Sequence, residues 1–128
     1  MKIDEFRPIA EKLFAEIRAL SFDGIGISRD SYGDKESATA DYLSAFAEEN
    51  GLQTWRDRAA NLRIGFPDTP ADSSVIWCGS HIDSVPQGGN FDGLAGVTAG
   101  LLCLLAQQRS GRRSPLPLQV IGLRGEES

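Results

Sequence analysis

One histidine and several carboxylates follow two apolar runs of the sequence, at spacings that suit metal chemistry. His81 is the only histidine among the 128 residues, and Asp83 follows it at i+2. An aspartate at that spacing can accept the ring N–H of the histidine, which fixes the tautomer and leaves the other nitrogen free for a metal ion. A structural histidine just past the end of a strand remains the alternative interpretation.

Asp92 lies in a glycine-rich segment directly before an apolar helical run. We expect it at the N-cap of that helix, where free N–H groups and the helix dipole stabilise a carboxylate. Such a residue is either a plain cap or a rigid carboxylate that bridges metal ions. Gly88 and Gly89 permit a tight turn, which would bring Asp92 to face His81.

Two adjacent glutamates, Glu126 and Glu127, follow the last apolar run. Adjacent carboxylates at the mouth of a buried strand are costly unless something positive holds them. A metal would do so, with one glutamate as a ligand and its neighbour as a base on a water molecule. A solvated turn is the alternative. Imidazole and carboxylate donors together suit Zn, Mn or Co.

The elements that must position these residues follow from the hydrophobic pattern. The predicted helices cover residues 3–20, 35–50 and 93–108. The predicted strands cover residues 52–57, 61–66, 75–79 and 118–123. The first two strands form a hairpin, and the last two are apolar throughout, as in strands covered on both faces.

This order of elements predicts an α/β domain with helices over a sheet. Residues 21–34 form a long loop rich in Gly, Ser and Asp between the first two helices. The loop after the strand at 75–79 leads into a helix, so it lies at the carboxyl edge of the sheet, where ligand sites of open α/β sheets form. Gly96, Ala99 and Gly100 give that helix a flat side for packing on the sheet.

The composition excludes some functions. The formal charge is −5, from 13 basic and 18 acidic residues, which gives no electrostatic footprint for nucleic acid or an anionic membrane.

Cys78 and Cys103 lack C-x-x-C spacing and are expected to be buried free thiols in a reducing compartment. The longest apolar stretch is too short for a bilayer, which needs roughly 20 residues, and no signal peptide is apparent. A cytoplasmic protein is expected.

The candidate site residues lie in two sequence segments that together form one recognisable motif. The run from Gly79 to Gly93, with its Ser-His-Ile-Asp-Ser and Gly-Gly-Asn-Phe-Asp-Gly segments, precedes an apolar helix and then Leu123 to Ser128. Together they resemble the M20 metallopeptidase clan, and within it the branch of N-carbamoyl-L-amino acid hydrolases, ureidopropionases and allantoate amidohydrolases. The segments 26–33 and 60–62 resemble that branch too. The resemblance implies a three-layer α/β/α zinc-peptidase-like catalytic domain with a mixed sheet, of which residues 1–128 are the N-terminal portion.

The resemblance also implies a role for each site residue. His81 matches a ligand of one metal, Asp83 the acid that orients this histidine, and Asp92 the carboxylate that bridges two metals. Glu127 matches a ligand of the second metal, and Glu126 matches the general base. The implied cofactors are two divalent ions, Zn, Mn or Co. The implied reaction is hydrolysis of the carbamoyl C–N bond of an N-carbamoyl-L-amino acid or related ureido compound.

The chain departs from the resembled family beyond Glu127. Members carry two further histidine ligands, a smaller dimerisation domain and the rest of the catalytic domain, so a homodimer is expected of a full-length protein and little activity of residues 1–128 alone. Two alternatives stay open. One is an aminoacylase or peptidase of the same clan, acting on N-acyl amino acids or peptides. The other is a truncated fragment without catalysis.

Overall fold

The computed structural model describes residues 2–128 and confirms the predicted order of elements. The elements are η1 (Ile3–Glu5), α1 (Arg7–Ser21), α2 (Asp34–Glu49), β1 (Gln53–Arg56), β2 (Leu62–Gly65), β3 (Ile76–His81), α3 (Leu94–Ser110) and β4 (Leu118–Leu123). The single helix expected over residues 3–20 begins instead as the 3₁₀ turn η1, and α1 follows. Pro8 explains the break, because it lacks an N–H and is tolerated only in the first turn of a helix.

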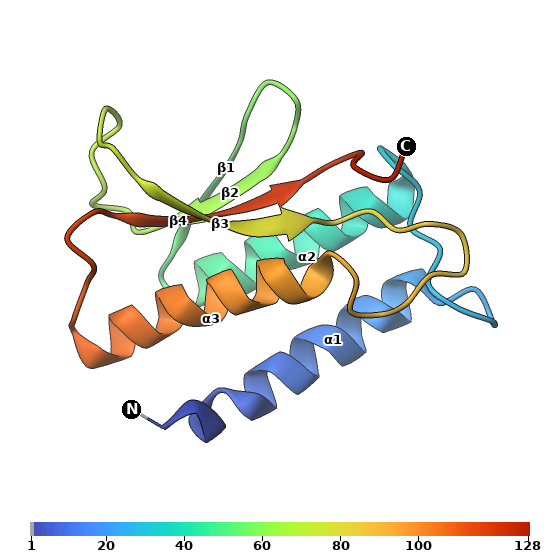
Figure 1. Ribbon diagram of the computed structural model, residues 1–128, viewed down its shortest axis with the longest axis horizontal. Coiled ribbons are helices and arrows are strands. Elements are labelled where there is room, and N and C mark those ends of the chain that lie inside the picture. The colour runs from blue at the N-terminus through green and yellow to red at the C-terminus, as the bar shows by residue number, and fades with distance from the viewer. Residues whose placement is uncertain (1) are drawn as a thin grey trace.

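The four strands form one mixed sheet in the order β1-β2-β4-β3 (Figure 1). The β1–β2 and β2–β4 pairs are antiparallel, and β1–β2 is the predicted hairpin. β3 and β4 are parallel, and α3 connects them. The predicted α/β class and mixed sheet are therefore confirmed.

All three α-helices lie on the same side of the sheet (Figure 1). One apolar cluster joins the inward side chains of these helices to Leu62 and Ile64 of β2 and Val120 of β4. Two glycines let α3 approach the sheet closely. A Cβ at Gly96 would lie 2.7 Å from the Cβ of Ser80, and one at Gly100 would lie 2.9 Å from a methyl of Val120. Ala99 was expected on this flat side, but it is exposed.

The expectation that β3 is covered on both faces is wrong for residues 2–128. β3 is an edge strand, and 44% of Ile76 and 45% of Trp77 are exposed. On the face turned away from the helices, the Arg63 guanidinium lies 4.4 Å from the Trp77 ring centre and 5.3 Å from that of Trp55. Of the three layers implied by the resemblance, residues 2–128 supply the sheet and one helical layer.

The cysteines differ from the expectation as well. Both are free thiols, but Cys78 is only half-buried and Cys103 is exposed. Cys103 lies on a part of α3 that the described residues leave uncovered. An apolar pattern around a whole helix predicts burial all round, and within residues 2–128 only one side of α3 is covered. None of the described helices has the length and apolar character needed to cross a bilayer.

Candidate metal centre

Three of the predicted site residues meet at the carboxyl edge of the sheet. The Nε2 atom of His81 lies 3.4 Å from Oδ2 of Asp92 and 3.8 Å from Oε1 of Glu127. One donor atom from each of the three lies within 4.8 Å of the others. The parallel pairing explains the convergence, since His81 at the end of β3 is in register with Leu123 at the end of β4. The loops that carry Asp92 and Glu127 start from this same edge.

His81 is the last residue of β3 and does not lie beyond the strand, as was expected. Its Nδ1 atom lies 2.9 Å from the main-chain oxygen of Asp83 and 3.5 Å from the carboxylate Oδ1. The hydrogen-bond acceptor is therefore the carbonyl, where the sequence favoured the carboxylate. The consequence is the same, because a ring that donates from Nδ1 to this carbonyl has Nε2 directed at the acids.

Asp92 is not the N-cap of α3. The N-cap is Gly93, with a φ of +68°, and no side chain forms a cap hydrogen bond there. The Asp92 main-chain oxygen accepts the Leu94 N–H at 2.7 Å. The Asp92 side chain instead faces His81, and 66% of it is exposed. The interpretation of Asp92 as a plain cap is wrong, because Gly93 is the N-cap and the Asp92 carboxylate forms no cap hydrogen bond.

Asp83 is fully buried beneath the loop that carries the two glutamates. Its carboxylate accepts hydrogen bonds from the Ser31 hydroxyl at 2.6 Å, from the Glu126 N–H at 3.1 Å and from the Glu127 N–H at 2.8 Å. Burial alone would raise the pKa of Asp83, but these hydrogen bonds outweigh it and lower the pKa. The carboxylate of Asp83 thus holds the glutamate loop, while its carbonyl orients His81.

The side chains of Glu126 and Glu127 differ in their exposure to solvent. The Glu127 side chain is 24% exposed and belongs to the cluster, whereas Glu126 is exposed beside it. Partial burial raises the pKa of Glu127, and neighbouring Asp92 and Glu126 raise it further, against a lowering by His81. Two carboxylates this close repel each other, and a bound cation relieves that repulsion. The imidazole and carboxylate donors therefore fit a divalent ion such as Zn or Mn.

The loop after β4 is held by side chains from distant segments. Its four consecutive N–H groups, of residues 124 to 127, all donate to side-chain oxygens. Arg124 N–H donates to Asn61 Oδ1 at 2.8 Å, and Gly125 N–H donates to Glu36 Oε1 at 3.1 Å. The next two donate to Asp83, as described above. Three separate parts of the chain therefore fix one short loop.

Sequence reasoning missed Glu36 as a residue near the site. A signal was present, because the buried positions of α2 are Glu36, Thr39, Ala40, Leu43 and Ala47, which recur at spacings of three and four. A glutamate on the buried stripe of a helix needs a polar partner. Asn61 was noticed only as part of a resembling segment.

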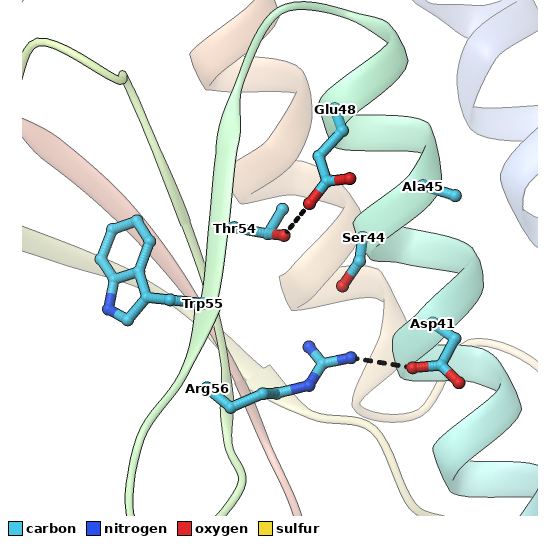
Figure 2. Close-up of a pocket in the computed structure, with 7 residues that line it drawn as sticks. All are labelled: Asp41, Ser44, Ala45, Glu48, Thr54, Trp55 and Arg56. Atoms are coloured by element: carbon cyan, nitrogen blue, oxygen red, sulfur yellow. Dashed lines mark hydrogen bonds and ion pairs between the residues drawn. The ribbon is translucent and has the colours of Figure 1, made fainter.

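A hollow of about 410 Å³ lies between α2 and β1 and contains none of the predicted site residues (Figure 2). Its charged groups have partners across the hollow. Arg56 lies 3.2 Å from Asp41, and Thr54 donates to Glu48 at 2.5 Å. Figure 2 shows the Trp55 ring pointing away from the hollow. These contacts join α2 to β1.

Comparison with known proteins places the chain among amidohydrolases. No family model matches it. The chain is 34% identical over 102 residues to an N-carbamoyl-L-amino acid amidohydrolase of Geobacillus stearothermophilus, covering 80% of this chain and 25% of that protein. It is 29% identical over 101 residues to a ureidoglycolate hydrolase of Oryza sativa subsp. japonica, covering 79% of this chain and 21% of that protein.

The structure gives a matching result. A crystal structure of an amidase of the hydantoinase/carbamoylase family from Burkholderia multivorans superposes with a TM-score of 0.82 at 28% identity, over 92% of this chain and 30% of that chain. The chain is thus a homologue of the N-carbamoyl-L-amino acid amidohydrolases and ureidoglycolate hydrolases, as the resemblance predicted. It spans about a quarter of the length of the curated relatives it matches.

Proposed function

We propose that this chain is the N-terminal portion of the catalytic domain of a metal-dependent amidohydrolase. The substrate would be an N-carbamoyl-L-amino acid or a related ureido compound, and the bond broken would be the carbamoyl C–N bond. The observation that carries the proposal is the convergence of His81, Asp92 and Glu127 at the carboxyl edge of the sheet. The names of the relatives supply the substrate class.

Each residue of the cluster has a place in this proposal. His81 would hold one divalent ion, Glu127 a second, and Asp92 would bridge them. When bound, the ions would polarise the substrate carbonyl and lower the pKa of a water molecule. Glu126 is exposed beside the cluster, so its carboxylate can accept a proton from the attacking water and deliver it to the leaving nitrogen. Asp83 keeps His81 and the glutamate loop in place.

The ligand set within residues 2–128 is incomplete for two ions. Zinc is usually bound by four ligands, and the cluster here offers three residues. We therefore propose that the remaining ligands come from outside residues 2–128. The alternative of a non-catalytic fragment differs from this proposal in predicting no metal binding in any context.

The test uses the complete gene product, stripped of metal and then loaded with Mn²⁺. Release of ammonia from N-carbamoyl-L-amino acids is compared with hydrolysis of N-acyl amino acids and dipeptides, which an aminoacylase or peptidase would prefer. We expect Glu126→Gln to bind Mn²⁺ normally and to lower kcat by about 10²- to 10⁴-fold, the usual contribution of a general base.

Asp92→Asn should weaken Mn²⁺ binding, because an amide is a poorer ligand than a carboxylate. Asp72→Asn, in an exposed loop, is the matched control and should leave binding and turnover unchanged. Unchanged Mn²⁺ affinity in Asp92→Asn, or unchanged turnover in Glu126→Gln, would contradict the proposal.

A further inference from the structure

Glu36 is a fully buried carboxylate that contacts the glutamate loop but not the metal cluster. It accepts the Gly125 N–H at 3.1 Å, the Arg124 Nε–H at 2.8 Å and the Tyr32 N–H at 2.6 Å. A charged residue in the core is costly unless it is paired and hydrogen-bonded. The hydrogen bonds of Glu36 connect it to the loop after β4 and to Tyr32.

Asp83 and Glu36 hold this loop in the same manner. Both are fully buried, and each carboxylate accepts N–H groups of the loop and one donor from residues 31–32. Asp83 accepts hydrogen bonds from the N–H groups of Glu126 and Glu127 and from the Ser31 hydroxyl. Glu36 accepts hydrogen bonds from the N–H groups of Gly125 and Tyr32. The two carboxylates therefore clamp consecutive amides of one loop against one supporting segment.

Side-chain packing restricts the same loop from another direction. The Arg124 guanidinium lies 4.9 Å from the centre of the Tyr32 ring, and its Nη2 donates to Ser37 at 2.9 Å. Gly125 has a φ of +70°, and a Cβ there would lie 2.5 Å from Cε2 of Tyr32. The loop conformation is thus fixed both by hydrogen bonds and by close packing.

The position of this loop decides where the two functional glutamates lie. Glu127 and His81 are 3.8 Å apart at their nearest donor atoms. A displacement of about 1 Å is enough to cost 10²-fold in a positioned site. We propose that Glu36 is a positioning residue of the metal centre, acting through the amide of Gly125 and the side chain of Arg124 on Glu126 and Glu127. This inference rests on the proposed function.

The test is Glu36→Gln in the complete gene product. Glutamine keeps the shape but turns one acceptor oxygen into an NH₂ group, which then faces the donors of Arg124 or Gly125. We expect the Mn²⁺ affinity, measured by calorimetry on metal-free protein, to fall by about 10- to 100-fold. We also expect kcat to fall with little change in KM, and the amides of residues 125–127 to exchange faster with deuterium. Glu49→Gln, at the exposed end of the same helix, is the matched control and should behave as wild type.

A second variant keeps the inference testable if Glu36→Gln does not fold. Asn61→Ala removes the acceptor of the Arg124 N–H without touching a buried charge. Asn61→Ala should also lower Mn²⁺ affinity and kcat, by a smaller factor than Glu36→Gln. A purely structural role would lower the melting temperature and yield while leaving Mn²⁺ affinity and kcat per folded molecule at wild-type values.

The outcomes separate this inference from the proposed function. Wild-type Mn²⁺ affinity and kcat in folded Glu36→Gln would overturn the inference and leave the proposed function standing. The same result in Asn61→Ala would overturn it if Glu36→Gln does not fold. A wild-type protein that binds no Mn²⁺ would overturn both.

Discussion

Gly93 is the residue whose lack of a side chain allows His81 its position. A Cβ on Gly93 would lie 2.5 Å from both Cε1 and Nδ1 of the His81 ring, and the φ of +68° already disfavours other residues. The ring cannot move away without losing its Nδ1 contact with the Asp83 carbonyl. The geometry of the candidate metal centre therefore depends on a glycine at position 93.

We therefore predict that Gly93→Ala displaces the His81 ring and lowers Mn²⁺ affinity by at least tenfold, measured by calorimetry on the complete gene product. Gly89→Ala is the matched control, because nothing lies within 4 Å of a Cβ there. Equal Mn²⁺ affinities of Gly93→Ala and wild type would contradict this prediction, because they would show that a side chain at position 93 does not disturb His81.

Asp23 organises the loop between α1 and α2. It accepts the N–H groups of Ile25 and Gly26 at 2.9 Å each and the Ser28 hydroxyl at 2.5 Å. The hydrogen bonds from Gly26, Ser28 and Ile25 lower the pKa of Asp23 to about 2. A folded-state pKa below the unfolded value means that the carboxylate stabilises the fold above pH 4, and that this contribution is lost as the pH falls toward 2.

Asp23→Asn should therefore lower the free energy of unfolding at pH 7, and the difference from wild type should shrink between pH 4 and pH 2. Urea unfolding at several pH values measures it. A difference that is the same at pH 2 as at pH 7 would contradict the assignment of these hydrogen bonds to the ionised carboxylate.

The sequence predicted three residues that the structure brings together, and it did not predict all of the residues that hold them in place. His81, Asp92 and Glu127 were singled out because their residue types bind metals and they follow strands. Their contact distances could not be predicted, because these depend on the register of β3 with β4. The roles of Glu36 and Asn61 depend on contacts across 89 and 63 positions of the chain, which no local pattern records.

At the scale of elements, α3 shows what the pattern could predict. A continuous apolar run predicted a helix against the sheet, and Gly96 and Gly100 do lie against β3 and β4. The same run predicted burial on every side, yet Cys103 is exposed. Hydrophobic periodicity indicates that a face is covered in the whole fold, and it does not say which residues cover it.

The close contact of α3 with β4 gives a stability prediction. A Cβ at Gly100 would lie 2.9 Å from Cγ2 of Val120 and 3.3 Å from Sγ of Cys78, so Gly100→Ala forces either the Val120 side chain or α3 to shift. We expect a loss of about 1–3 kcal/mol, the usual cost of overpacking a core. Thermal unfolding of the complete gene product measures it. Gly111→Ala is the comparison variant. A Cβ at Gly111 would contact nothing within 4 Å, but the φ of +66° strains any other residue, so its loss of stability reports backbone strain without overpacking.

At the scale of the whole molecule, residues 2–128 form one helical layer and a four-stranded sheet whose β3 edge and outer face are open. An exposed edge strand invites pairing with other chains. We predict that residues 1–128 expressed alone aggregate or unfold without cooperativity, and that they release little or no ammonia from N-carbamoyl-L-amino acids with Mn²⁺. Size-exclusion chromatography and turnover assays test this. Cooperative unfolding of an active monomer would contradict it.

We propose above that His81, Asp92 and Glu127 hold divalent metal ions. The most direct measurement is a crystal structure of the complete gene product grown with Mn²⁺, with anomalous diffraction used to locate the metal. We expect anomalous peaks within bonding distance of His81 Nε2 and of the Asp92 and Glu127 carboxylates, with Asp92 between two ions. A structure with fully occupied Mn²⁺ elsewhere and none at these three side chains would contradict it.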